Sequence, residues 1–163
     1  MDTRPKPIVP FSSFLSGKPS KNYILNLLSH HIFEIAPGRS LDAGAGELRN
    51  LWMFPGKYVG ISRERATYFK GLERPPNPQV IQKRGMPDVY LMRLESDFSF
   101  LGEFDLAVCT FTMMYIEDRV DLITRLSDRV RQGGALIIEA PIESVDGALA
   151  VLEPRFEEIE LVY

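Results

Sequence analysis

Residues 40–48 decide the fold, and they read Ser-Leu-Asp-Ala-Gly-Ala-Gly-Glu-Leu. A short strand runs into Asp42 and then meets two glycines, Gly44 and Gly46, which allow a tight turn and a close approach to a ligand because no Cβ intervenes. A helix predicted to begin near Glu47 would present unpaired N–H groups to an anion. Asp42 can orient the loop or accept a hydrogen bond from a ligand ammonium group. The same residues also suit a strand-to-helix turn that binds nothing.

Strands and helices alternate on both sides of this turn. The predicted strands are residues 40–42, 58–61, 89–94, 104–109, 135–139 and 156–162, with a fragment at 79–82. The predicted helices are residues 21–35, 47–54, 63–72, 119–131 and 144–152. Such alternation indicates βαβ units with right-handed crossovers, and therefore an α/β fold with a doubly wound, mostly parallel sheet. Ligands of such sheets bind beyond the carboxyl ends of the strands.

The length and composition fit one domain. Residues 1–20 carry four prolines and are predicted to form an irregular arm, and residues 21–163 a single α/β domain. The helix predicted over 119–131 places four apolar residues on one face and has Gly133-Gly134 as its C-cap. Those four residues are Val120, Ile123, Leu126 and Val130.

Charge and cysteine content exclude several classes of protein. The net charge of −3 argues against non-specific binding to nucleic acid, which requires a concentrated basic face. No apolar run is long enough for a signal peptide or a membrane span. Cys109 is the only cysteine, so no internal disulfide can form. A soluble, cytoplasmic protein is the expectation.

A dinucleotide-binding site fits the turn less well. The fingerprint G-x-G-x-x-G fails because its third glycine position holds Arg49. The acidic residue that would read the ribose at the end of the second strand is also missing, since Ser62 lies there and Glu64 follows two residues later.

Three segments in order instead resemble class I S-adenosylmethionine-dependent methyltransferases. Residues 40–48 are similar to their first motif, an acidic residue followed by x-G-x-G-x-G. Residues 103–118 (EFDLAVCTFTMMYIED) resemble their fourth-strand segment, and residues 126–139 (LSDRVRQGGALIIE) their segment from helix to fifth strand. The resemblance covers residues 40–139 and implies a Rossmann-like methyltransferase fold.

The resemblance also implies a cofactor, S-adenosylmethionine, and the residues around it. Asp42, Ala43 and Gly44, together with Gly46, would line its methionine and ribose parts. Other positions follow from the family pattern: Ser62 and its neighbour Arg63 for the ribose, Glu95 or Ser96 for the adenine amino group, and Cys109, Thr110 and Phe111 beside the methionine and methyl group. The implied reaction is methyl transfer to an oxygen or nitrogen of a small or medium acceptor, with no catalytic base assigned.

Departures from the family pattern keep a second interpretation open, that of a catalytically degenerate binding or assembly module. Leu48 replaces the third motif glycine, and Ser62 replaces a carboxylate that binds both ribose hydroxyls. Losing a charged acceptor costs about 1.5–3 kcal/mol. The chain is also short at its C-terminus and is expected to lack the last antiparallel strand. The strand predicted over 156–162 would then be an exposed edge, which makes a homodimer plausible.

The remaining polar side chains have structural interpretations. His30 and His31 are adjacent, so they cannot form an i, i+4 metal pair, and no metal site is predicted. Asp118 suits the N-cap of the following helix. Cys109 fits a small buried residue better than a nucleophile.

Overall fold

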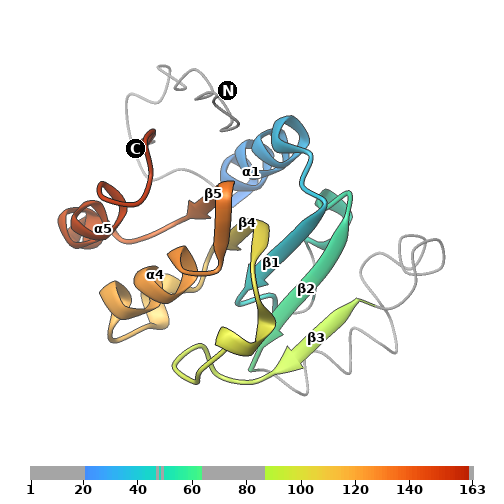
Figure 1. Ribbon diagram of the computed structural model, residues 1–163, viewed down its shortest axis with the longest axis horizontal. Helices are drawn as coiled ribbons and strands as arrows, with labels where there is room; N and C mark the ends of the chain where they lie inside the picture. The colour runs from blue at the N-terminus through green and yellow to red at the C-terminus, as the bar shows by residue number, and fades with distance from the viewer. Residues whose placement is uncertain (1–20, 47, 49, 64–86, 162–163) are drawn as a thin grey trace.

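The sheet is built from five parallel strands. The computed structural model describes residues 21–46, 48, 50–63 and 87–161. Within these, the strand order is β3-β2-β1-β4-β5 and every pairing is parallel (Figure 1). The strands are β1 (Arg39–Ala43), β2 (Lys57–Ser62), β3 (Asp88–Leu91), β4 (Phe104–Cys109) and β5 (Val130–Ile138). The predicted α/β class and doubly wound parallel sheet are confirmed.

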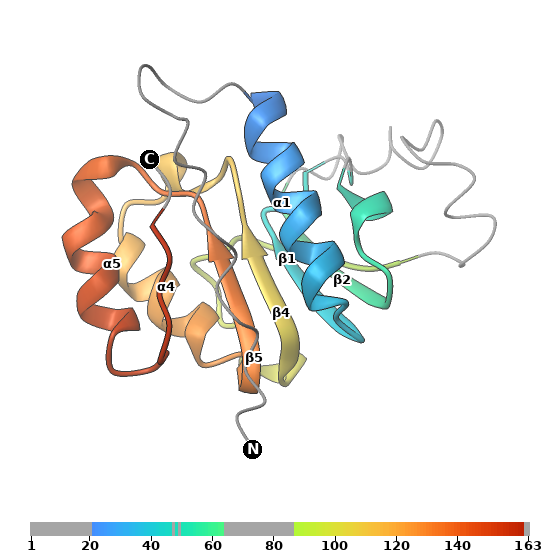
Figure 2. The ribbon, with the colours of Figure 1, turned by 90° about the horizontal axis from the view of Figure 1, so that it is seen from above.

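Helices cover both faces of the sheet. Helix α1 (Lys21–Ile35) lies on one face, while α4 (Arg119–Ser127) and α5 (Val145–Leu152) lie on the other (Figure 2). Side chains of β4 alternate between these layers: Leu106 and Val108 pack with the α1 residues, whereas Ala107 and Cys109 pack with those of α4 and α5. This alternation follows from the two-residue period of a strand whose faces are both buried.

The helix predicted over 47–54 is wrong. Within the described residues, the chain after the glycine turn forms turns and the three-residue 3-10 helix η1 (Leu51–Met53). Leu48 has a left-handed φ of 61°, which an α-helix does not accommodate. Pro55-Gly56 then ends the segment, so too few residues remain for a regular helix.

The predicted helix over 119–131 ends four residues early. Asp118 is its N-cap as expected, and its side chain accepts a hydrogen bond from the Asp121 N–H at 3.0 Å. Val130 belongs to β5, and Val120 is 47% exposed, so neither lies on the buried face of the helix. Leu122, Ile123 and Leu126 are the buried residues of that face.

Gly133-Gly134 is not a C-cap. Both residues lie inside β5, at an irregularity of its pairing with β4: Phe104 pairs with Val130, but Leu106 pairs with Ala135. Gly133 has a φ of 79°, and a Cβ on Gly134 would lie 2.8 Å from the Asp105 carbonyl oxygen. The two glycines therefore form a bulge rather than end a helix.

Two predicted strands differ from the structure, and some predicted elements lie outside the described residues. The third strand is shorter than predicted and ends at Leu91. Residues 156–161 form no strand, so the predicted sixth strand is wrong over that range, and β5 is the last strand of the described sheet. The arm at 1–20, residues 64–72 of the helix predicted over 63–72, and the fragment predicted at 79–82 fall outside the described part. No helix in the described ranges is both long and apolar enough to cross a membrane.

Candidate functional site

The carboxyl edge of β1, β2 and β4 brings the glycine turn to the middle of the sheet. Because β1 pairs with β2 on one side and β4 on the other, the turn at Gly44 lies between the ends of these two neighbours. Ser62 ends β2, and Thr110 follows β4. In a doubly wound sheet this is where a ligand is expected.

The glycine turn is fixed to β2 by its backbone. The N–H groups of Gly44 and Ala45 both donate to the carbonyl oxygen of Ile61, at 3.0 and 2.8 Å. Gly44 has a φ of 85° and Gly46 a φ of 52°, in the region that glycine adopts without strain. A Cβ on Gly46 would meet no atom within 4 Å, so the turn has bare, open backbone at this residue.

Asp42 is a buried carboxyl group directly below the turn. It is 1% exposed, and its Oδ2 accepts a hydrogen bond from the Tyr58 hydroxyl at 2.7 Å. Burial raises the pKa of Asp42 to about 6, and the bond from Tyr58 opposes part of that rise. Burial, followed by the charge of Asp42, raises the pKa of Tyr58 well above its ordinary value. Tyr58 was not identified from the sequence, although a hydroxyl within an otherwise apolar strand was the available signal.

The loop after β4 closes over the turn. Thr112 contacts Gly44 so closely that a Cβ on Gly44 would lie 2.1 Å from the Thr112 Oγ1. That hydroxyl donates to the Thr110 carbonyl at 3.0 Å. Phe111 has a left-handed φ of 55°, and its N–H donates to Glu139 Oε2 at 2.6 Å. Sequence reasoning missed Thr112 and Glu139, because only the fold places them beside the turn.

Thr110 carries an unsatisfied polar atom. The residue is 5% exposed, and its Oγ1 has no hydrogen-bond partner within the described structure. A buried hydroxyl without a partner costs free energy, so such an atom calls for an explanation such as a ligand. Cys109, one residue earlier, is fully buried, and burial raises the pKa of its thiol to about 12. Its side chain is therefore a neutral packing group, as the sequence indicated.

The other predicted contacts lie around the same edge but differ in accessibility. Ser62 is 2% exposed, and Arg63 beside it is exposed. Glu95 and Ser96 lie in the exposed loop after β3. Glu95 there forms an ion pair with Arg93 at 3.6 Å. The structure thus brings the residues of β1 and β4 together, and it leaves Glu95 and Ser96 on a peripheral loop.

Solved structures share this fold. The chain matches an S-adenosylmethionine-dependent methyltransferase from Clostridium acetobutylicum with a TM-score of 0.58 at 13% identity, covering 76% of this chain and 51% of that one. It matches an amino pentose methyltransferase from Micromonospora echinaspora with a TM-score of 0.55 at 17% identity, covering 76% and 52%. For a coclaurine N-methyltransferase the TM-score is 0.56 at 12% identity, covering 78% and 39%. The chain has the class I S-adenosylmethionine-dependent methyltransferase fold. It spans about half the length of the first two structures and 39% of the third, and no protein-family model and no curated protein matches it.

Within this methyltransferase fold, the residues at the carboxyl edge fit the cofactor in part. The open backbone at Gly46 and the unsatisfied hydroxyl of Thr110 suit a polar ligand. Asp42 is enclosed by Tyr58 and is not free to contact a ligand directly. Thr112 covers Gly44, so a ligand reaching that glycine would have to share or displace the threonine side chain.

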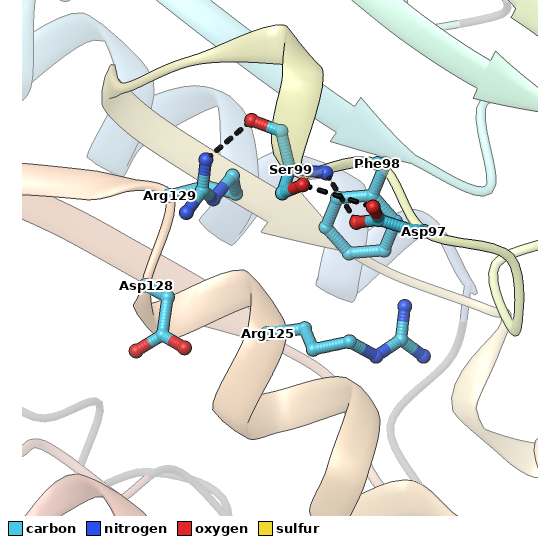
Figure 3. Close-up of a pocket in the computed structure, with 6 residues that line it drawn as sticks. All are labelled: Asp97, Phe98, Ser99, Arg125, Asp128 and Arg129. Carbon is cyan, nitrogen blue, oxygen red and sulfur yellow. Dashed lines mark hydrogen bonds between the residues drawn. The ribbon is translucent and has the colours of Figure 1, made fainter.

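Two of the surface hollows on the described part are lined by other residues than those of this site. One of about 70 Å³ lies between α4 and the loop that precedes β4, and its residues are Asp97, Phe98, Ser99, Arg125, Asp128 and Arg129 (Figure 3). Its polar groups bind one another: Ser99 donates to Asp97, and Arg129 donates to the Ser99 carbonyl. An apolar groove of about 560 Å³ lies between α1 and η1 and includes Phe33 and Trp52. Trp52 is 53% exposed and lines this groove.

Proposed function

We propose that the carboxyl edge of β1, β2 and β4 binds S-adenosylmethionine, and that the protein transfers its methyl group to an oxygen or nitrogen of a small or medium acceptor. The observation that carries the proposal is the open glycine backbone at Gly46 together with the unsatisfied hydroxyl of Thr110, at the carboxyl edge of the sheet. The fold supports it, because the matched structures are named as methyltransferases, among them an amino pentose methyltransferase and an N-methyltransferase.

The residues proposed to form the cofactor site have separate tasks, some by contact and some by supporting the turn. They are Asp42, Ala43, Gly44, Gly46, Ser62, Arg63, Glu95, Ser96, Cys109 and Thr110. When bound, the cofactor supplies an electrophilic methyl group on its sulfonium. The chain then contributes binding, orientation and exclusion of water, because alignment for in-line attack provides much of such an acceleration. Asp42 acts through the shape of the turn, and Ser62 offers a single hydroxyl where a carboxylate would accept two bonds.

The acceptor is proposed to bind on the loops that follow β4 and β5. Three apolar side chains in these loops are strongly exposed: Met114 at 49%, Tyr115 at 72% and Ile142 at 73%. Arg119 ties the two loops together, since its Nε donates to the Met113 carbonyl at 2.9 Å and its Nη1 to Ser144 Oγ at 2.8 Å. An acceptor with an apolar portion fits this surface.

A degenerate binding or assembly module is the second candidate. The contact of Thr112 with Gly44 favours it, because the chain's own side chain lies against the glycine that would receive the cofactor. The serine at position 62 points the same way, and so does the short 3-10 helix η1 that the described residues form after the turn. In this case the turn is a retained part of the fold and no methyl transfer occurs.

Thr112→Gly distinguishes the two candidates. If the protein is a methyltransferase, the unaltered protein binds S-adenosylhomocysteine in calorimetric titration, and Thr112→Gly changes the affinity only a few-fold. The module candidate predicts no binding by the unaltered protein and new binding by Thr112→Gly. Thr112→Ser is the matched control, because it keeps the hydroxyl that donates to Thr110 and removes only a methyl group.

We also propose that the edge of β5 that pairs with no described strand supports self-association. The strand is only half-buried, and residues 133–138 carry no charge that would discourage pairing with a second copy. Sedimentation of the unaltered protein at rising concentration would then show a mass above that of a monomer. An unaltered protein that is already monomeric would contradict this.

A further inference from the structure

Tyr58 lies in β2 beneath the glycine turn, and its side chain links β2 to β1, the strand from which the turn begins. The residue is 5% exposed, in β2, and its hydroxyl donates to Asp42 Oδ2 in β1 at 2.7 Å. Its ring meets that of Phe54 edge-on, with 5.1 Å between the ring centres. The ring is therefore fixed on one side by packing and at its tip by a hydrogen bond.

Gly60 leaves the space in which Tyr58 and the turn meet. A Cβ on Gly60 would lie 3.1 Å from the Cβ of Ala45, 3.1 Å from Cε1 of Tyr58 and 3.3 Å from its hydroxyl oxygen. Ala45 is the residue between the two glycines of the turn. The missing side chain at Gly60 thus lets the tyrosine and the turn approach each other over the same α-carbon.

This support takes the place of a helix. Within the described residues only the three-residue η1 lies between the turn and β2, so the described chain has no full helical turn there to hold the glycines. What remains is β2, through the carbonyl of Ile61 that accepts from Gly44 and Ala45, and through Tyr58. Hydrogen bonds to a buried carboxyl group are among the stronger ones in proteins, so the bond to Asp42 is well suited to this purpose.

We propose that Tyr58 is a positioning residue of the candidate cofactor site: its hydrogen bond to Asp42 and its packing beside Ala45 hold the turn at Gly44 and Gly46 in the shape that receives the cofactor. The inference rests on the proposed function for its role in binding. The mechanical part, the support of the turn by Tyr58, stands on the contacts alone.

The neighbours of Asp42 give this role a signature that depends on pH. The titratable groups that interact with it in the described part are Tyr58 in β2 and Cys109 in β4, and both are uncharged near neutral pH. Tyr58 is thus the group that stabilises the ionised carboxylate. Without the Tyr58 hydroxyl, ionised Asp42 would be buried with no hydrogen-bond donor from β2, which costs free energy. Protonated Asp42 carries no charge, so the loss of the same hydrogen bond costs it less free energy.

Tyr58→Phe tests the proposal with two readouts. Amide hydrogen exchange of Gly44, Ala45 and Gly46 should accelerate about tenfold, and affinity for S-adenosylhomocysteine should fall about tenfold at about pH 8 and less at about pH 5. The double variant Asp42→Asn, Tyr58→Phe should recover much of the slow amide exchange and much of the affinity, because a neutral amide at position 42 tolerates the loss of the Tyr58 hydroxyl donor. Tyr90→Phe makes the same chemical change in β3 and should alter neither readout.

The outcomes separate the two levels of the inference. Unchanged exchange and affinity in Tyr58→Phe, with only a lower melting temperature, would overturn the proposal and make Tyr58 an ordinary core residue. Faster exchange in a protein whose unaltered form binds no S-adenosylhomocysteine would overturn the proposed function and leave the support of the turn standing. Gly60→Ala, which pushes the ring away while keeping its hydroxyl, should reproduce the faster exchange.

Discussion

Asp42 is a buried carboxyl group that the described structure pairs with a neutral phenol. Burial raises its pKa from 3.8 to about 6, so the folded chain holds this proton more tightly than the unfolded chain. The contribution to stability is then greatest below the unfolded pKa and is lost as the pH rises through about 6. Groups of this kind gather at functional sites, which agrees with the place of Asp42 below the glycine turn.

Asp42→Asn should therefore stabilise the protein near neutral pH. The amide oxygen can still accept from Tyr58, while the cost of burying a charge disappears. The raised pKa of Asp42 corresponds to a gain in the free energy of unfolding of Asp42→Asn on the order of 3 kcal/mol at pH 7. This gain falls toward zero near pH 4. Denaturant unfolding of both proteins across this range measures it. Parallel pH profiles for the two proteins would show that Asp42 does not cause the dependence.

The sequence predicted some residues of the site and not their partners. Asp42, Gly44 and Gly46 could be identified because their order along the chain is itself the signal. Tyr58 and Glu139 lie 16 and 28 residues from the groups that they bind, and no local pattern joins them. The strand register makes those contacts: Asp42 pairs with Gly60, so Tyr58 comes to lie on the same face of the sheet.

At the scale of elements, β4 was predicted with its bounds, whereas β5, the longest described strand, was predicted only over 135–139. β4 matches its predicted bounds because six residues with buried side chains on both faces leave little ambiguity. Gly133-Gly134 was interpreted as a C-cap because glycine serves both caps and bulges. The close approach of Gly134 to β4, which only the fold reveals, decides between them.

Gly134→Ala should destabilise the fold by about 1–3 kcal/mol, because the added carbon would lie 2.8 Å from the Asp105 carbonyl oxygen and 2.8 Å from Val130 Cγ1. Gly147→Ala in α5 is the matched control. Its added carbon meets only Val120 Cγ2, at 3.1 Å, on a half-exposed side chain, and alanine favours a helix by about 1 kcal/mol. Equal unfolding free energies for the two variants would contradict the bulge as a packing constraint.

At the scale of the whole molecule, alternation of strands and helices was enough to predict the class of fold. Five parallel strands with helices on both faces follow from the right-handed crossover and from the need to bury both sides of the sheet. The strand predicted at 156–162 was wrong over its described residues. Its alternating pattern supplies side chains suited to a strand, and no described strand pairs with it.

The central claim, a cofactor site at the glycine turn, is tested most directly by calorimetric titration of Gly44→Ala with S-adenosylmethionine and S-adenosylhomocysteine. Gly102→Ala is the matched control, because Gly102 has a similar left-handed φ, 78° against 85° for Gly44. Gly102 lies before β4, and a Cβ added there would have its nearest atom at 3.8 Å. We predict that the unaltered protein and Gly102→Ala bind both compounds and that Gly44→Ala binds neither. The claim would be contradicted if the unaltered protein bound neither compound at millimolar concentration, or if Gly44→Ala bound them as tightly as Gly102→Ala.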